Sequence, residues 1–187
     1  SPMSRGLGDV YKRQVRNAMR DEAITARFYS PEASTFMDEA ADLAEMLCAM
    51  IGYSFVRRPI SWPARMQYIE GEHNYLLEAA HNPSGMRMAI PEIAAILPER
   101  WSLLLGTSPQ QEMNEFLAPI FALIEEFPPL EIITTEPQNG RYPGVVEPIN
   151  GIQHIENPEI AIQSFTEQND LIVVTGSLYL CGNILSV

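Results

Sequence analysis

Three short stretches of the chain carry residue types that could hold an anion or a phosphoryl group. The first, residues 78–83, reads EAAHNP and sets the carboxylate of Glu78 and the imidazole of His81 just before a predicted helix. The second, residues 175–177, reads TGS and directly follows a strongly apolar run. The third is Arg65, whose guanidinium, if fixed in place, could bind phosphate or carboxylate through two parallel hydrogen bonds.

Two of these stretches lead into predicted helices. Asn82 can cap a helix by accepting a hydrogen bond from its first turn, and Pro83 fits that turn because the missing N–H has no partner there. Gly176 permits a close backbone approach, and Ser177 can cap the last helix in the same way as Asn82. The backbone amides and the dipole at such helix starts favour an anion.

Each candidate also has an ordinary structural interpretation. Asn82 and Ser177 could serve only as helix caps, His81 could be a structural histidine, and Arg65 could be a surface charge. His154 has no candidate partner nearby in the sequence. Spacing alone therefore predicts an anion-accepting rim without assigning a reaction to it.

The segments around these residues alternate between strands and helices. Strands are predicted at residues 66–69, 75–77, 101–105, 130–134 and 171–175, with a weaker one at 152–155. Helices are predicted at residues 33–51, 83–96, 111–126 and 158–166, and a last one begins at Ser177. This alternation predicts an α/β fold with a mostly parallel sheet and helices on both faces. Ligands of such sheets bind beyond the carboxyl ends of the strands, where the polar stretches are expected.

Composition excludes several other classes of protein. The 187 residues carry 12 Lys and Arg against 24 Asp and Glu, and this net charge of -12 argues against nucleic acid as a partner. No apolar run approaches the roughly 20 residues that span a bilayer, so no membrane association is expected. The only cysteines, Cys48 and Cys181, lie in apolar runs. They predict two buried thiols in a reducing cytoplasm, with neither a disulfide framework nor a zinc site.

Residues 1–14 show no periodicity and share no pattern with the rest of the chain. They are interpreted as a non-native or disordered leader and excluded from the fold prediction.

Three sequence words together resemble one family. They are WPARMQYI at 62–69, LLEAAHNPSG at 76–85 and VVTGSLYLCG at 173–182. They are similar, in the same order, to W-P-G-R, L-D-G-A-H-N-P and V-T-G-S-L-Y-L-V-G of the dihydrofolate/folylpolyglutamate synthases, members of the Mur ligase superfamily. The resemblance runs from about residue 40 to the end. It implies a Rossmann-like C-terminal domain of the Mur ligase type at 61–187, preceded at 15–60 by the end of a central domain and a linker helix.

The resemblance also implies a reaction. ATP and Mg²⁺ convert a carboxylate of dihydropteroate or a folate into an acyl phosphate, which the amine of L-glutamate attacks in folate biosynthesis and one-carbon metabolism. The protein's own N-terminal ATPase domain would supply the phosphate loop and the magnesium ligands. Arg65 and Glu78 match the nucleotide-binding positions, and His81 and Ser177 match positions near the incoming glutamate. No catalytic residue or metal ligand is expected in this chain, and family members are commonly monomeric.

Two departures from the family pattern and the absence of one motif bear on function. The family's Asp-Gly is Glu78-Ala79 here, and the glycine before the arginine is Ala64. The sequence contains no G-x-x-x-x-G-K-[ST] phosphate loop, so this chain alone is expected not to turn over ATP.

Two alternatives stay open at the sequence level. A peptidoglycan-precursor amino-acid ligase would share the architecture and an A-H-N-P-like word, although the T-G-S-L-Y-L word favours the folate branch. A non-catalytic α/β module that kept the fold and lost the site would agree with the Glu78-Ala79 change and the strong acidity.

Overall fold

The computed structural model describes residues 17, 35–71, 73–110, 112–140, 149, 151–166 and 170–186. The chain divides into two compact units, residues 1–55 and 56–187. The predicted leader at 1–14 lies outside the described residues.

In the first unit, helix α2 (Phe36–Met50) begins at a capping residue that the sequence supplies. The hydroxyl of Thr35 accepts a hydrogen bond from the Asp38 amide at 3.1 Å, and two acidic residues in the first turn complement the helix dipole. Gly52 follows the helix with a φ of +80°, a left-handed conformation that suits glycine.

Cys48, the cysteine of α2, is less buried than the sequence predicted. Cys48 is only half-buried, so the prediction of a buried thiol was wrong at this position. The reason is that α2 has no buried residue, and its apolar side chains, including Leu43, Leu47 and Met50, are exposed. An amphipathic pattern predicts which face of a helix is apolar but not whether anything covers that face.

The second unit is built on one six-stranded sheet with the order β1-β2-β6-β3-β4-β5. Its strands are β1 (Gln67–Ile69), β2 (Tyr75–Glu78), β3 (Trp101–Leu105), β4 (Ile132–Thr134), β5 (Gln153–His154) and β6 (Leu171–Thr175). Strands β1 and β2 pair antiparallel, and all the other neighbours pair parallel. The two central strands, β3 and β6, are buried along their whole length, as continuous apolar runs in a parallel sheet require.

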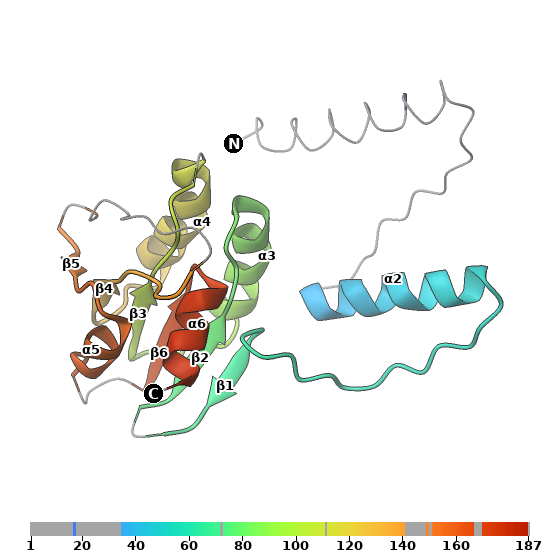
Figure 1. The fold of residues 1–187 in the computed structure, drawn as a ribbon, viewed down its shortest axis with the longest axis horizontal. Helices are drawn as coiled ribbons and strands as arrows, with labels where there is room; N and C mark the ends of the chain where they lie inside the picture. Colours follow the sequence, from blue (N-terminus) through green and yellow to red (C-terminus); the bar gives the residue numbers. More distant parts are fainter. Residues whose placement is uncertain are drawn as a thin grey trace. The chain divides into compact units, whose positions relative to one another are not determined.

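Helices cover both faces of this sheet (Figure 1). Helices α3 (Pro83–Ala94) and α4 (Met113–Glu126) pack on one face, and α5 (Pro158–Gln163) and α6 (Leu178–Leu185) pack on the other. Successive strand residues point to opposite faces, so Leu103 and Leu105 join the core under α3 and α4 while Leu104 joins the core under α5 and α6. The predicted α/β fold with a mostly parallel sheet and helices on both faces is confirmed.

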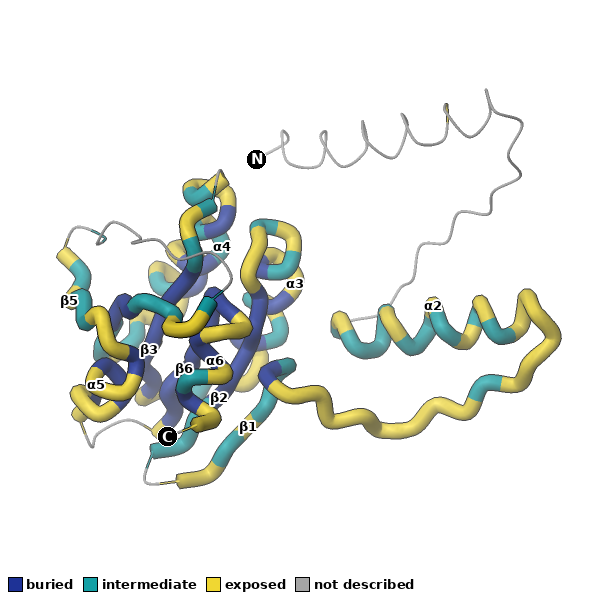
Figure 2. Tube along the Cα trace, viewed as in Figure 1, coloured by how far each residue is buried: buried dark blue, intermediate teal, exposed yellow. Residues whose placement is uncertain are grey.

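The burial pattern follows this layering. Strands β2, β3, β4 and β6 and the inward faces of the four helices form the buried part of the unit (Figure 2). None of the described helices is long and apolar enough to cross a membrane.

Cys181 on α6 is fully buried, as predicted. Its burial, with a smaller contribution from the negative charge of Glu78, raises the pKa of the thiol from 9.0 to about 12.

This shift predicts how stability depends on alkaline pH. The thiol must stay neutral in the folded chain, whereas the unfolded chain releases the proton above about pH 9. The stabilisation is therefore complete below pH 9 and is lost between pH 9 and about 12, at up to about 1.4 kcal/mol per pH unit. Urea unfolding would measure the free energy of unfolding of the protein and of Cys181→Ala across this pH range. The two values should differ by a constant amount below pH 9, and above pH 9 the value should decline less steeply in the variant. Parallel curves over the whole range would contradict the assignment.

Candidate functional site

The predicted polar stretches meet at one edge of the sheet, beyond the carboxyl ends of the parallel strands. The registers pair Glu78 at the end of β2 with Thr175 at the end of β6, and Thr175 with Leu105 at the end of β3. Leu105 in turn pairs with Thr134 at the end of β4. The turns that follow these strands therefore lie side by side, although they are far apart in the sequence.

Two glycines let these turns approach each other. Gly176 has a φ of +105°, and a Cβ atom there would lie 2.6 Å from the carbonyl oxygen of Gly106. A Cβ atom on Gly106 would lie 2.8 Å from the carbonyl oxygen of Thr135. Only glycine fits both positions without displacing backbone.

An ion pair joins the end of β2 to residues 62–67, here called the arginine turn, which lead into β1 and include its first residue. Arg65 Nη1 donates to Glu78 Oε1 at 2.8 Å, and the backbone N–H of Met66 donates to Glu78 Oε2 at 2.9 Å. The Glu78 side chain is 5% exposed and that of Arg65 is 29% exposed. The guanidinium is thus fixed on an almost buried carboxylate and still reaches the surface.

The backbone of the arginine turn is tightly specified. Ala64 and Met66 have φ values of +55° and +45°, which non-glycine residues adopt only when their surroundings enforce it. Gln67 Oε1 accepts from the Ala64 amide at 2.8 Å, and the Ala79 amide donates to the Ala64 carbonyl at 2.8 Å. The first of these hydrogen bonds lies within the arginine turn, and the second joins the turn to the residue after β2.

The helix starts beside this ion pair are capped as the sequence predicted. Asn82 Oδ1 accepts from the Gly85 amide at 2.7 Å with Pro83 in the first turn of α3, and the buried Ser177 Oγ accepts from the Tyr179 amide at 3.1 Å. The exposed His81 has its Nδ1 2.9 Å from the carbonyl oxygen of Ala79, a hydrogen bond that requires the proton on Nδ1. These contacts show that Asn82 and Ser177 cap their helices, as the sequence predicted.

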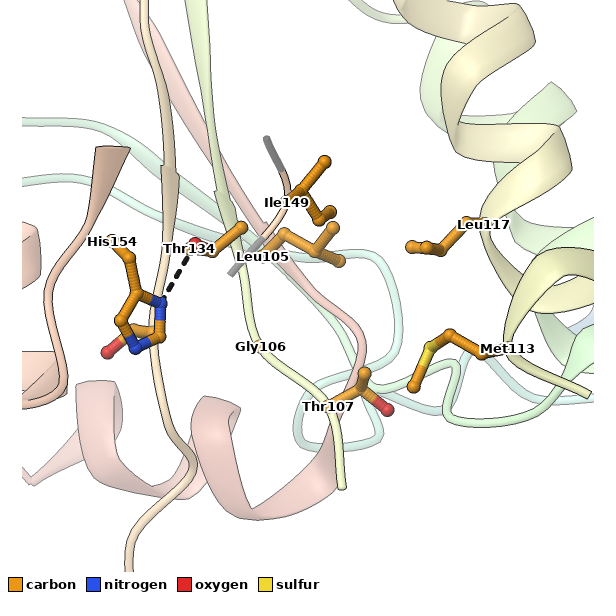
Figure 3. Close-up of a pocket in the computed structure, with 9 residues that line it drawn as sticks. Leu105, Gly106, Thr107, Met113, Leu117, Thr134, Ile149 and His154 are labelled. Carbon is orange, nitrogen blue, oxygen red and sulfur yellow. Dashed lines mark hydrogen bonds between the residues drawn. The ribbon is translucent and has the colours of Figure 1, made fainter. Parts of the chain in front are cut away.

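Sequence reasoning missed a pocket at the same edge of the sheet, between the ends of β3 and β4 and helix α4 (Figure 3). It measures about 420 Å³, including the space open to solvent, and its walls are mainly apolar. The lining residues are Leu105, Gly106, Thr107, Met113, Leu117, Thr134, Thr135, Ile149 and His154.

His154 is the one titratable group that lines this pocket, and the structure gives it partners that its sequence neighbourhood lacked. Its Nδ1 lies 3.0 Å from Thr134 Oγ1 (Figure 3), and its Nε2 lies 3.7 Å from Glu136 Oε1. The parallel pairing of β4 with β5 brings these residues together. The available signal was the T-T-E sequence at the end of one strand beside the weak segment at 152–155. A hydroxyl on one ring nitrogen and a carboxylate near the other fix the orientation of the imidazole.

The described residues hold no group of three or more His, Cys, Asp or Glu side chains that could bind a metal ion. The fold and the site together define an open, mostly parallel α/β domain. Its carboxyl-end edge carries a fixed guanidinium beside two capped helix starts.

This fold is shared with folylpolyglutamate synthases. The structure matches that of the Thermotoga maritima folylpolyglutamate synthase with a TM-score of 0.59 and 21% identity, over 79% of this chain and 37% of that one. It matches the Mycobacterium tuberculosis folylpolyglutamate synthase, complexed with ADP and AMPPCP, with a TM-score of 0.58 and 18% identity, over 75% of this chain and 37% of that one.

A third match is the bifunctional folylpolyglutamate synthase/dihydrofolate synthase of Yersinia pestis, complexed with AMPPNP and Mn ion. Its TM-score is 0.54 at 19% identity, over 74% of this chain and 36% of that one. No protein-family model matches the chain, and no curated protein matches it. The chain spans just over a third of the length of each of these three structures. The resemblance to these synthases is confirmed at the level of the fold.

Proposed function

We propose that this chain is the C-terminal part of an ATP-dependent ligase that joins L-glutamate to dihydropteroate or a folate. The observation that carries the proposal is the Arg65 guanidinium, fixed by Glu78 at the carboxyl-end edge of a sheet with this fold. Within this proposal residues 61–187 form the Mur ligase-type domain, and residues 15–60 form the end of a central domain with its linker helix.

The chemistry of such a ligase suits a fixed cation at this edge. Phosphoryl transfer depends mainly on positioning and on stabilising charge on the transferred oxygens. Arg65 would bind the phosphates of ATP and neutralise that charge, because a guanidinium keeps its proton and matches phosphate geometry.

The magnesium ligands and the phosphate loop belong to another domain in this proposal. The described residues offer no cluster that suits Mg²⁺, and the sequence has no phosphate loop. The N-terminal ATPase domain of the same protein would hold most of the ATP and the metal, and this domain would close over the nucleotide. Solved structures that share this fold are complexed with ADP and AMPPCP, or with AMPPNP and Mn ion, which supports ATP and a divalent metal as the cofactors of the ligase.

The remaining assignments concern the L-glutamate substrate, the oligomeric state and the cellular location. His81 lies next to a capped helix start, where the backbone dipole favours an anion such as the glutamate carboxylate, and Ser177 caps the other helix start. The ligase would work as a monomer in the cytoplasm.

The test is glutamate-dependent release of ADP by the longer protein that contains this chain and a phosphate loop. Assays would use ATP, Mg²⁺ and either dihydropteroate or a reduced folate, with omission of L-glutamate as the control. Release that needs both L-glutamate and a pterin substrate is expected. A correctly folded protein that releases no ADP with either substrate would instead support a non-catalytic module with the same fold.

A further inference from the structure

We propose that Glu78 is a positioning residue, which holds the Arg65 guanidinium ready for the nucleotide and does not itself bind the nucleotide. This inference rests on the proposed function for the role of Arg65. It replaces the expectation, taken from family resemblance, that the carboxylate at the end of β2 contacts the nucleotide directly.

The partners of the Glu78 carboxylate carry the inference. One oxygen accepts from Arg65 Nη1 at 2.8 Å, and the other accepts from the backbone N–H of Met66 at 2.9 Å. With the side chain only 5% exposed, little of its surface remains for a hydroxyl group of a nucleotide. The carboxylate binds the side chain and the backbone of the arginine turn at the same time.

The backbone of Glu78 is held equally firmly. Thr175 Oγ1 donates to the Glu78 carbonyl at 2.8 Å, and the Ala79 amide donates to Ala64 at 2.8 Å. Glu78 therefore links the sheet, through β6, to the arginine turn. This link fixes where the guanidinium lies relative to the strand ends.

The length of the side chain matters for this link. Glutamate reaches about 1.5 Å further than aspartate, the length of one carbon–carbon bond. An aspartate at the same backbone position would fall short of at least one of the two partners. An arginine side chain has many rotamers, and holding the guanidinium in place reduces the entropy lost when it aligns with the transferred phosphoryl group in the transition state.

A double-mutant cycle in the longer ligase tests the inference. The variants are Glu78→Gln, Arg65→Gln and the two together. If Glu78 acts through Arg65, Glu78→Gln lowers kcat about 10-fold in the presence of Arg65 and has no further effect beside Arg65→Gln. Glu78→Asp should give an intermediate kcat, and KM for ATP should change little.

The contrary result is independent action. If Glu78→Gln multiplies the defect of Arg65→Gln and raises KM for ATP in both backgrounds, then Glu78 meets the nucleotide itself and the inference is overturned.

A second measurement separates this inference from the ligase proposal because it needs no enzyme activity. NMR of the 187-residue chain would follow the order of the Arg65 Nε–H group and the hydrogen exchange of the Met66 amide. Glu78→Gln should disorder the guanidinium and speed Met66 exchange at least about 10-fold, since both contacts lose the charged acceptor. Glu115→Gln, at an exposed carboxylate 3.9 Å from Arg87, is the matched control and should change neither signal. An Arg65 side chain that stays ordered in Glu78→Gln would overturn the positioning role, whatever the ligase assay gives.

Discussion

Replacing Gly176 by alanine is expected to lower the free energy of unfolding by about 4 kcal/mol. Two effects add at this position. The φ of +105° is strained for any residue with a Cβ atom, and that atom would lie 2.6 Å from the carbonyl oxygen of Gly106. Backbone at the junction of β3 and β6 would have to move. Urea unfolding followed by the fluorescence of the buried Trp101 measures the loss.

Two other glycines separate these effects. Gly151 has a φ of +82° but open space around a Cβ atom, so Gly151→Ala should cost only the strain, about 1 kcal/mol. Gly182 lies inside α6 with open space and an ordinary helical backbone, and Gly182→Ala should stabilise by about 0.5–1 kcal/mol. If Gly176→Ala and Gly151→Ala lower the free energy of unfolding equally, the contact between a Cβ atom at position 176 and the Gly106 carbonyl oxygen contributes nothing to the destabilisation.

The second large effect is expected on activity. Arg65→Ala in the longer ligase should lower kcat about 10²- to 10³-fold, because the transferred phosphoryl group would lose a fixed positive charge. Glu78 would also lose the guanidinium from a nearly buried site, so the free energy of unfolding should fall by about 2 kcal/mol. Rates would be measured at a temperature where circular dichroism shows the variant to be folded.

Arg87→Ala is the matched control for the loss of an arginine. Arg87 lies 3.9 Å from Glu115, and both side chains are about half exposed, at 45% and 54%. Its removal should change stability by less than about 0.5 kcal/mol and leave kcat unchanged. A similar loss of activity in both variants would mean that Arg65 acts only through the net charge of the protein.

The sequence predicted the elements of the second unit well because their signals are local. Apolar periodicity located the strands and helices, and Asn82, Pro83 and Ser177 marked helix starts that the structure confirms. The Glu78 and Thr175 stretches meet because β2 and β6 pair in parallel, and Arg65 joins them because β1 runs antiparallel to β2.

The contacts within the site needed information that is not local. The Arg65–Glu78 pair depends on left-handed backbone conformations at Ala64 and Met66. Neither alanine nor methionine favours that conformation, so the sequence gives no signal for it. His154 acquires Thr134 as a partner only through the pairing of β4 with β5. The burial of a helix face depends on what packs against it, which is why the prediction for Cys48 was wrong.

The order of the strands also affects how readily the folded chain can aggregate with other copies of itself. The edge strands β1 and β5 are only 3 and 2 residues long, and the fully buried, mainly apolar β3 and β6 lie in the middle of the sheet. An exposed edge of unpaired backbone groups is the usual template for fibril-like growth, and a short edge offers few hydrogen bonds to an incoming strand. The aggregation-prone segments are therefore kept inside the sheet, where another molecule can reach them only if the domain unfolds.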